Sequence, residues 1–176
     1  MIGPMRAIFG GRRRTTFGPG RELGLYRSEL EQRTQRIDVR LAQVADDIDA
    51  LRRRDLDPVE AIGRLGVHED ALDEESNGLI GMMAPEDLHG LHMEYEANLE
   101  RALRGIVTVE RGCGITRLRH RPLDDEEPYT YYKRGHANVT HARMRMAEIV
   151  EVLLSWEPGR PAEATVAARM ERTRGS

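Results

Sequence analysis

An apolar heptad ladder is the sequence feature that most constrains the fold of this chain. One row repeats every seven residues: Leu23, Leu30, Ile37, Val44 and Leu51. A second row lies four residues after Leu30, Ile37 and Val44: Thr34, Leu41 and Ile48. No Pro or Gly interrupts the sequence from Leu25 to Asp57, so the pattern predicts one long α-helix with a narrow apolar seam, as in a coiled coil. Such a seam has to be covered by another helix, so the ladder predicts helix–helix association.

The composition favours a thin helical bundle over a thick core built on a sheet. The chain has 176 residues, which is enough for one domain with a modest core. Only 39% of the residues are hydrophobic and 5% are aromatic, whereas 32% are charged. We therefore predict an all-α fold: an antiparallel bundle of three long helices and one short, weak helix, with a small non-helical insert.

Proline, glycine and runs of charge divide the chain into segments. Residues 1–20 are rich in Gly and Pro and contain Arg but no acid, which is typical of a flexible basic arm. We expect one domain over 21–157, with helices at about 20–57, 58–75, 85–111 and 136–156. The insert is expected at about 112–135, as a β-hairpin or an ordered loop, because Gly112-Cys113-Gly114 and the strand-prone run from Tyr129 to Tyr132 break the helical pattern. Residues 158–176 are expected to form a tail or a short helix.

The length of the first helix leads to the main functional prediction. We expect the seam to pair with the helix at 85–111, which is about two thirds as long, so one end of the seam would need a second chain or the last helix. This predicts a non-catalytic structural or adaptor protein that associates with itself or with a protein partner. The predicted interaction seam is Leu23, Leu30, Ile37, Leu41, Val44, Ile48 and Leu51.

Charge and cysteine content restrict the remaining classes. The net charge of −3 gives no global field toward nucleic acid. Lys133 is the only lysine, a bias that fits an Arg-rich bacterial codon usage. Cys113 is the only cysteine, so no internal disulfide can form. It is expected on an exposed turn and as an incidental residue. No apolar run approaches the ~20 residues of a membrane span, and we expect a cytoplasmic protein.

A cluster of His and carboxylate residues gives an alternative, metal-binding hypothesis. Glu-x-x-His on one helix face is the ligand pair of ferritin-like bundles, which use it twice together with two further Glu. This chain has one copy, so no cofactor is expected under the main prediction, and a divalent metal belongs to the alternative. The candidate ligands are Glu86, His89, His92, Glu96, His136 and His141.

A third hypothesis is a nucleic-acid-binding accessory protein that uses the insert and the basic arm. Cations interleaved with aromatic rings suit single-stranded nucleic acid, because the charges meet phosphates and the rings stack on bases. Four acids between the two halves of the insert would oppose this, so nucleic acid is not the favoured partner. The candidate residues are Arg12, Arg13, Arg14, Arg117, Arg119, Arg121, Tyr131, Tyr132, Lys133 and Arg134.

Several catalytic motifs do not occur in the sequence. It contains no phosphate-binding loop ending in Lys-Ser/Thr, no His-Glu-x-x-His, no Gly-x-Ser-x-Gly and no paired Cys-x-x-Cys. An enzyme with a standard cofactor motif is therefore not expected.

Overall fold

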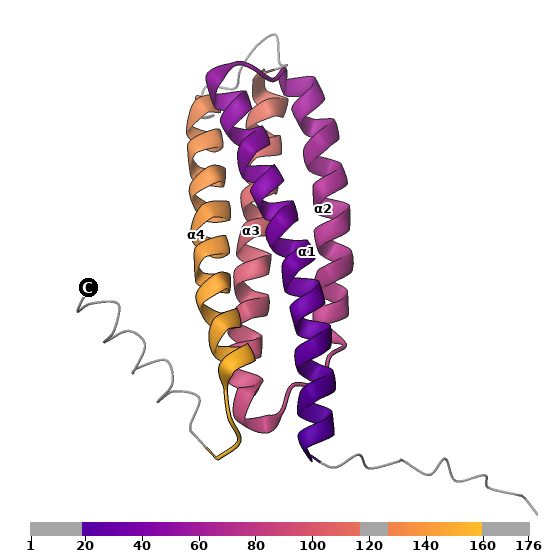
Figure 1. Cartoon of the computed structure of the whole chain (residues 1–176). Helices are drawn as coiled ribbons and strands as arrows, with labels where there is room; N and C mark the ends of the chain where they lie inside the picture. The colour runs from indigo at the N-terminus through magenta and orange to yellow at the C-terminus, as the bar shows by residue number, and fades with distance from the viewer. Residues whose placement is uncertain (1–18, 117–126, 160–176) are drawn as a thin grey trace, which may run out of the picture.

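A computed structural model describes residues 19–116 and 127–159 of the chain, and every regular element among them is helical (Figure 1). The elements are α1 (Pro19–Arg53), α2 (Pro58–Ile80), the short 3-10 helix η1 (Glu86–Leu88), α3 (His89–Thr116) and α4 (Pro128–Ser155). The predicted all-α bundle is confirmed. None of the described helices combines the length and the apolar character that crossing a membrane would require.

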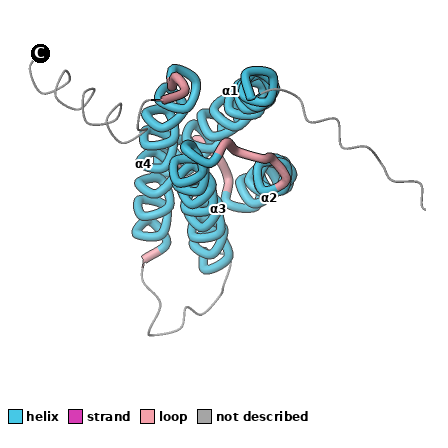
Figure 2. The backbone as a smooth tube through the Cα atoms, turned by 90° about the horizontal axis from the view of Figure 1, so that it is seen from below, coloured by secondary structure: helices cyan, strands magenta, loops and turns pink. Residues whose placement is uncertain are grey.

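The four long helices run alternately up and down the bundle (Figure 1). α1 begins at the end of the bundle where α4 finishes, and the connection from α1 to α2 lies at the opposite end. Viewed end-on in Figure 2, α3 lies between α2 and α4. α3 packs most extensively on α4, whereas α1 packs on α2 and α4 and touches α3 only slightly. The prediction that α1 and α3 are the main partners is therefore wrong, because these helices face each other diagonally.

The heptad seam of α1 forms one side of the core. All seven predicted seam residues are buried within this chain: Leu23, Leu30, Ile37, Leu41, Val44, Ile48 and Leu51. Even the two ends are covered, since Leu23 is 8% exposed and Leu51 is 4% exposed. The predicted excess of uncovered seam is therefore wrong. α2 and α4, with 23 and 28 residues, are both longer than expected and flank the seam on either side.

α2 continues past its predicted stop at Ser76-Asn77-Gly78. It begins with an N-cap at Asp57, whose carboxylate accepts a hydrogen bond from the backbone N–H of Val59 at 2.8 Å. It ends at Ile80, so it is not the short, weak helix that we expected. Leu79, one heptad after the buried Leu72, is completely buried. Burial of these side chains outweighs the cost of glycine within a helix, which is ~1 kcal/mol relative to alanine.

α3 also continues through its predicted end. Gly112 and Cys113 are buried helical residues, and the helix extends through Thr116, the last described residue of this stretch. A Cβ atom at Gly112 would lie 2.7 Å from the Cβ of Tyr131 on α4, closer than real Cβ atoms approach. This glycine therefore acts as a close packing site between two helices and not as a helix stop.

The described ends of the predicted insert are helical. α4 begins at Pro128 and not at His136, so the strand expected over Tyr129 to Tyr132 is wrong. Tyr131 and Tyr132 are buried against α3, and this packing outweighs their local strand propensity. Residues 117–126 of the predicted insert, 1–18 of the arm and 160–176 of the tail lie outside the described residues.

Candidate functional site

Most of the predicted metal ligands do not converge. Glu86 and His89 are exposed around the start of α3, and His141 is exposed on α4. His136 instead faces Asp49 of α1, with Nε2 and Oδ2 3.5 Å apart. Within residues 19–116 and 127–159, no group of three or more His, Cys, Asp or Glu side chains is placed to hold a metal ion.

The remaining two candidates, His92 and Glu96, meet in a buried hydrogen-bond network. His92 Nε2 lies 3.1 Å from Glu96 Oε1 and 3.2 Å from the backbone oxygen of Leu79. Both oxygens are acceptors, so Nε2 carries a proton, and Nδ1 is hydrogen-bonded to the Tyr26 hydroxyl at 3.0 Å. Burial, and secondly the charge of Glu96, raises the pKa of Tyr26 far above its usual value, which keeps this hydroxyl protonated. The network fixes α1, α2 and α3 to one another.

The aromatic candidates for nucleic-acid binding are packed inside the bundle. Tyr131 and Tyr132 are each 6% exposed, so their rings are not available to stack on bases. The Tyr132 hydroxyl lies 3.0 Å from the Thr116 hydroxyl. Lys133 and Arg134 are exposed at the start of α4. The other six candidates fall outside the described residues: Arg12, Arg13, Arg14, Arg117, Arg119 and Arg121.

Cys113 does not lie on an exposed turn as predicted. It is fully buried in α3, and burial raises the pKa of its thiol to about 11. A hydrogen bond with Tyr132 lowers this pKa but does not offset the effect of burial. A thiol that keeps its proton at neutral pH is a poor nucleophile. Its position is that of a small core residue in the contact between α3 and α4.

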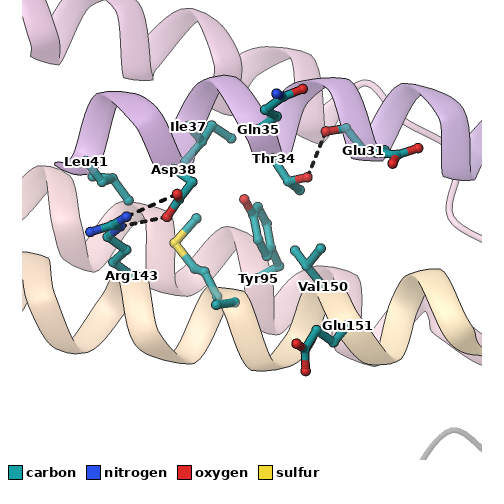
Figure 3. Close-up of a pocket in the computed structure, with 12 residues that line it drawn as sticks. Glu31, Thr34, Gln35, Ile37, Asp38, Leu41, Tyr95, Arg143, Val150 and Glu151 are labelled. Atoms are coloured by element: carbon teal, nitrogen blue, oxygen red, sulfur yellow. Dashed lines mark hydrogen bonds and ion pairs between the residues drawn. The ribbon is translucent and has the colours of Figure 1, made fainter. Parts of the chain in front are cut away.

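A groove between α1 and α4 opens above core side chains that are themselves almost completely buried (Figure 3). Its volume is about 420 Å³. The lining residues are Glu31, Thr34, Gln35, Ile37, Asp38, Leu41, Tyr95, Arg143, Met146, Ala147, Val150 and Glu151. α1 packs on α4 less extensively than α3 does, and the groove lies where α1 and α4 leave a gap above Tyr95 of α3.

Tyr95 places an unpaired hydroxyl in this groove. The side chain extends from α3 toward α1 in Figure 3 and is only 1% exposed. Its hydroxyl makes no hydrogen bond with any described residue. The nearby Thr34 hydroxyl instead donates to the backbone oxygen of Glu31 at 3.0 Å. Burial raises the pKa of Tyr95 far above its usual value. A neutral donor therefore faces a mainly apolar groove.

The two ends of the groove differ in charge. At one end Arg143 donates to both carboxylate oxygens of Asp38, at 2.6 and 3.1 Å, and this pair closes the groove. At the other end Glu31 and Glu151 lie on opposite rims (Figure 3). Among the lining residues there are thus three carboxylates and one guanidinium. Charge complementarity favours an occupant with a basic group at the Glu31 end.

Two of the other openings lie between α1 and α2 and at the end of the bundle. One of about 360 Å³ lies between α1 and α2 around Val39 and Leu72. Another, of about 960 Å³, lies at the end of the bundle, where Thr116 and Glu127 flank the undescribed residues 117–126. The α1/α4 groove differs from both because the Tyr95 hydroxyl, which has no hydrogen bond to a described residue, faces it.

Sequence reasoning placed Ile37, Leu41 and Tyr95 on apolar helix faces but did not find the groove. Whether the Tyr95 hydroxyl finds a hydrogen-bond partner depends on which helices are neighbours and on how far apart they lie. Neither property has a local sequence signature. Comparison of the chain with models of protein families, with curated proteins and with solved structures found no match.

Proposed function

We propose that this protein is a non-catalytic adaptor that binds a basic amphipathic helix of a partner protein in the α1/α4 groove. The observation that carries the proposal is the groove itself, an opening of about 420 Å³ with apolar walls and charged rims. Helices bind grooves of this kind by inserting apolar side chains spaced three and four residues apart. Association was also expected from the sequence, through the seam of α1; two seam residues, Ile37 and Leu41, line the groove, although each is only 1% exposed.

The rim and floor of the groove suggest what the partner helix presents. Glu31 favours a basic residue at one end, and Ile37 and Met146, which are 1% and 3% exposed, form an apolar floor in the middle. The Tyr95 hydroxyl faces the groove and can donate a hydrogen bond to an oxygen of the partner.

The histidines of the core support a non-catalytic role. His92 is bound by Tyr26 on one side and by Glu96 and Leu79 on the other. His68 in α2 lies 3.2 Å from the carboxylate of Asp47. Neither histidine lines the groove, so both are better explained as residues that hold helices together than as acid–base catalysts.

A groove-filling substitution tests the proposal. Ala147 is an exposed rim residue, so Ala147→Trp should block the groove without disturbing the core. Met144→Trp, at a position that is 61% exposed and outside the groove, is the matched control. Proteins retained by the wild type from cells of the source organism would be identified, and the binding of their helical segments measured directly. We expect Ala147→Trp to abolish binding and Met144→Trp to preserve it, whereas equal binding by both variants would contradict the proposal.

Sedimentation of the same three proteins shows whether the partner is a second copy of this chain. Reversible self-association that Ala147→Trp removes would identify the second copy as the partner. Self-association that persists in Ala147→Trp would place that contact outside the groove.

A further inference from the structure

We infer that a second copy of this chain docks on the outer face of α3, antiparallel to the first and related to it by two-fold symmetry. Six residues form a row along this face, which we call the outer row: Met93, Ala97, Glu100, Arg104, Val107 and Arg111. Every residue of the outer row is exposed, so no described helix covers it. None of the six lines the α1/α4 groove, so the inference does not depend on the proposed function.

The outer row has the spacing and the position of a seam for another helix. Its residues are separated by alternating steps of four and three, as in a coiled coil. Tyr95 extends from α3 toward α1 (Figure 3) and lies two residues, or about 200° around the helix, from both Met93 and Ala97. The outer row is therefore on the side of α3 that faces away from α1. Because α2 and α4 lie to either side of α3 (Figure 2), this side is left for a contact outside the chain.

The charges at the centre of the outer row are complementary to themselves. Antiparallel pairing of two copies at the level of Ala102 places Glu100 of each copy beside Arg104 of the other. Within one chain Arg104 Nη1 lies 3.2 Å from Glu100 Oε2, and these side chains are 68% and 63% exposed. Two copies would join their two ion pairs into one network of four alternating charges, which selects this register over others.

The neighbouring layers are complementary in size. Ala97 of each copy meets Val107 of the other, so a small side chain faces a larger one on both sides of the charges. Val107 and Met93 are each 50% exposed in the single chain, and the contact would cover both. Gly90 and Gly114 continue the same spacing at the two ends, and a Cβ atom at either would meet nothing within 4 Å. The packing of one chain does not require these glycines, whereas they allow two helices to approach closely.

The exposed face of α2 has the same spacing but not the same complementarity. It carries three acids and no cation, so two copies of this face would repel each other. Its residues are Glu60, Gly63, Val67, Asp70, Glu74 and Asn77. On the outer row of α3, in contrast, exposed ion pairs contribute little energy and few large apolar side chains are covered. We therefore expect a weak, reversible dimer.

Charge exchange between two full-length variants tests the docking. Glu100→Arg makes the centre of the outer row basic and Arg104→Glu makes it acidic, so each variant should repel itself, whereas an equimolar mixture has opposite charges in both pairs. The matched control is Glu60→Arg. Glu60 is 56% exposed and forms an i,i+4 pair with Arg64 at 2.6 Å, but it lies on α2. Sedimentation equilibrium measures the dissociation constant, and circular dichroism checks that each variant is folded.

We expect the wild type and Glu60→Arg to dimerise reversibly at concentrations up to about 500 µM. Each variant of the outer row should raise the dissociation constant roughly tenfold or more, and the mixture should recover most of the loss. A monomeric wild type at this concentration would overturn the inference, as would a mixture that associates no better than its components. Loss of self-association in Ala147→Trp would also overturn it, because that result places the contact in the α1/α4 groove.

Disulfide trapping tests the antiparallel register. In the docked pair Ala97 lies beside Val107 of the second copy, whereas the two Ala97 residues are ten residues, or about 15 Å, apart along the helix axis. A disulfide requires Cα atoms within about 7 Å of each other. Ala97→Cys protein mixed with Val107→Cys protein, with oxidised glutathione as the oxidant, should therefore give mainly the mixed disulfide by mass spectrometry. Cys113 is buried and should not compete. Disulfides mainly between two Ala97→Cys chains would overturn the antiparallel docking.

Discussion

α4 makes two contacts of opposite character. Against α3 the backbones themselves meet: a Cβ atom at Gly105 would lie 3.0 Å from the backbone oxygen of Gly135, and one at Gly135 would lie 2.6 Å from that of Gly105. Against α1 the side chains of Ile37 and Met146 line an open groove. On one side of α4, Gly105 and Gly135 allow a short separation between α3 and α4, and this contact holds the fold together. The other side leaves an open groove, where we propose that a partner helix binds.

The largest expected effect breaks the tight contact. Gly135→Ala places a Cβ against Val109 and the backbone of Gly105, neither of which can move far within a packed core. We expect a loss of about 3 kcal/mol in the free energy of unfolding, at the upper end for an overpacked core. The control is Gly63→Ala, where a Cβ meets nothing within 4 Å; it should stabilise the protein by ~0.5–1 kcal/mol. Urea denaturation measures both, and a neutral Gly135→Ala would contradict the close approach.

High pH should weaken the same contact. Burial raises the pKa of Cys113 to about 11 and that of Tyr132 to about 12. Unfolded Cys113, with its ordinary pKa of 9.0, loses its proton first, so the unfolded state gains stability as the pH rises. The contribution is fully present below pH 9 and is lost between about pH 9 and 11.

For Cys113 we expect a loss of about 2 kcal/mol over this interval, measured by denaturation at several pH values. Cys113→Ala removes the titrating thiol and should give a shallower decline. The same slope in both proteins would show that the thiol is not buried as the structure places it.

The next effect concerns the end of α1 closest to the groove entrance. Tyr26→Phe removes the hydroxyl that is hydrogen-bonded to His92 Nδ1 and leaves this buried ring nitrogen unpaired. The expected cost is about 1–2 kcal/mol in thermal or chemical unfolding. Tyr129→Phe, at a tyrosine that is 47% exposed, is the control and should be close to neutral. A neutral Tyr26→Phe would indicate that α1 is not held by this network.

The smallest effect sharpens the comparison most. Tyr132→Phe, in the tight contact, loses a hydrogen bond with Thr116 and should cost about 1 kcal/mol. Tyr95→Phe, in the groove, loses no bond within the described residues and should change stability by less than about 0.5 kcal/mol. Parallel denaturation curves test this difference. An equal loss in both variants would mean that the Tyr95 hydroxyl has a partner inside the protein.

The sequence predicted the helical class and the buried face of α1, because heptad spacing is a local property that survives in any helical context. It failed where tertiary packing decided the outcome. The local pattern predicts a helix stop at Gly112, although this residue marks the close approach of α4, and a strand at Tyr131, although this residue packs on α3. The groove could not be predicted, because it depends on the spacing between α1 and α4, which are distant in the sequence.

Site-specific photo-crosslinking tests the central claim, that the α1/α4 groove is the binding surface, most directly. A benzophenone amino acid would replace Ala147 on the groove rim of the full-length protein, or Met144 outside the groove, in the source organism. The account predicts a discrete adduct with another protein chain from position 147 that is absent from position 144. The same adducts from both positions, or none with another chain from position 147, would contradict it.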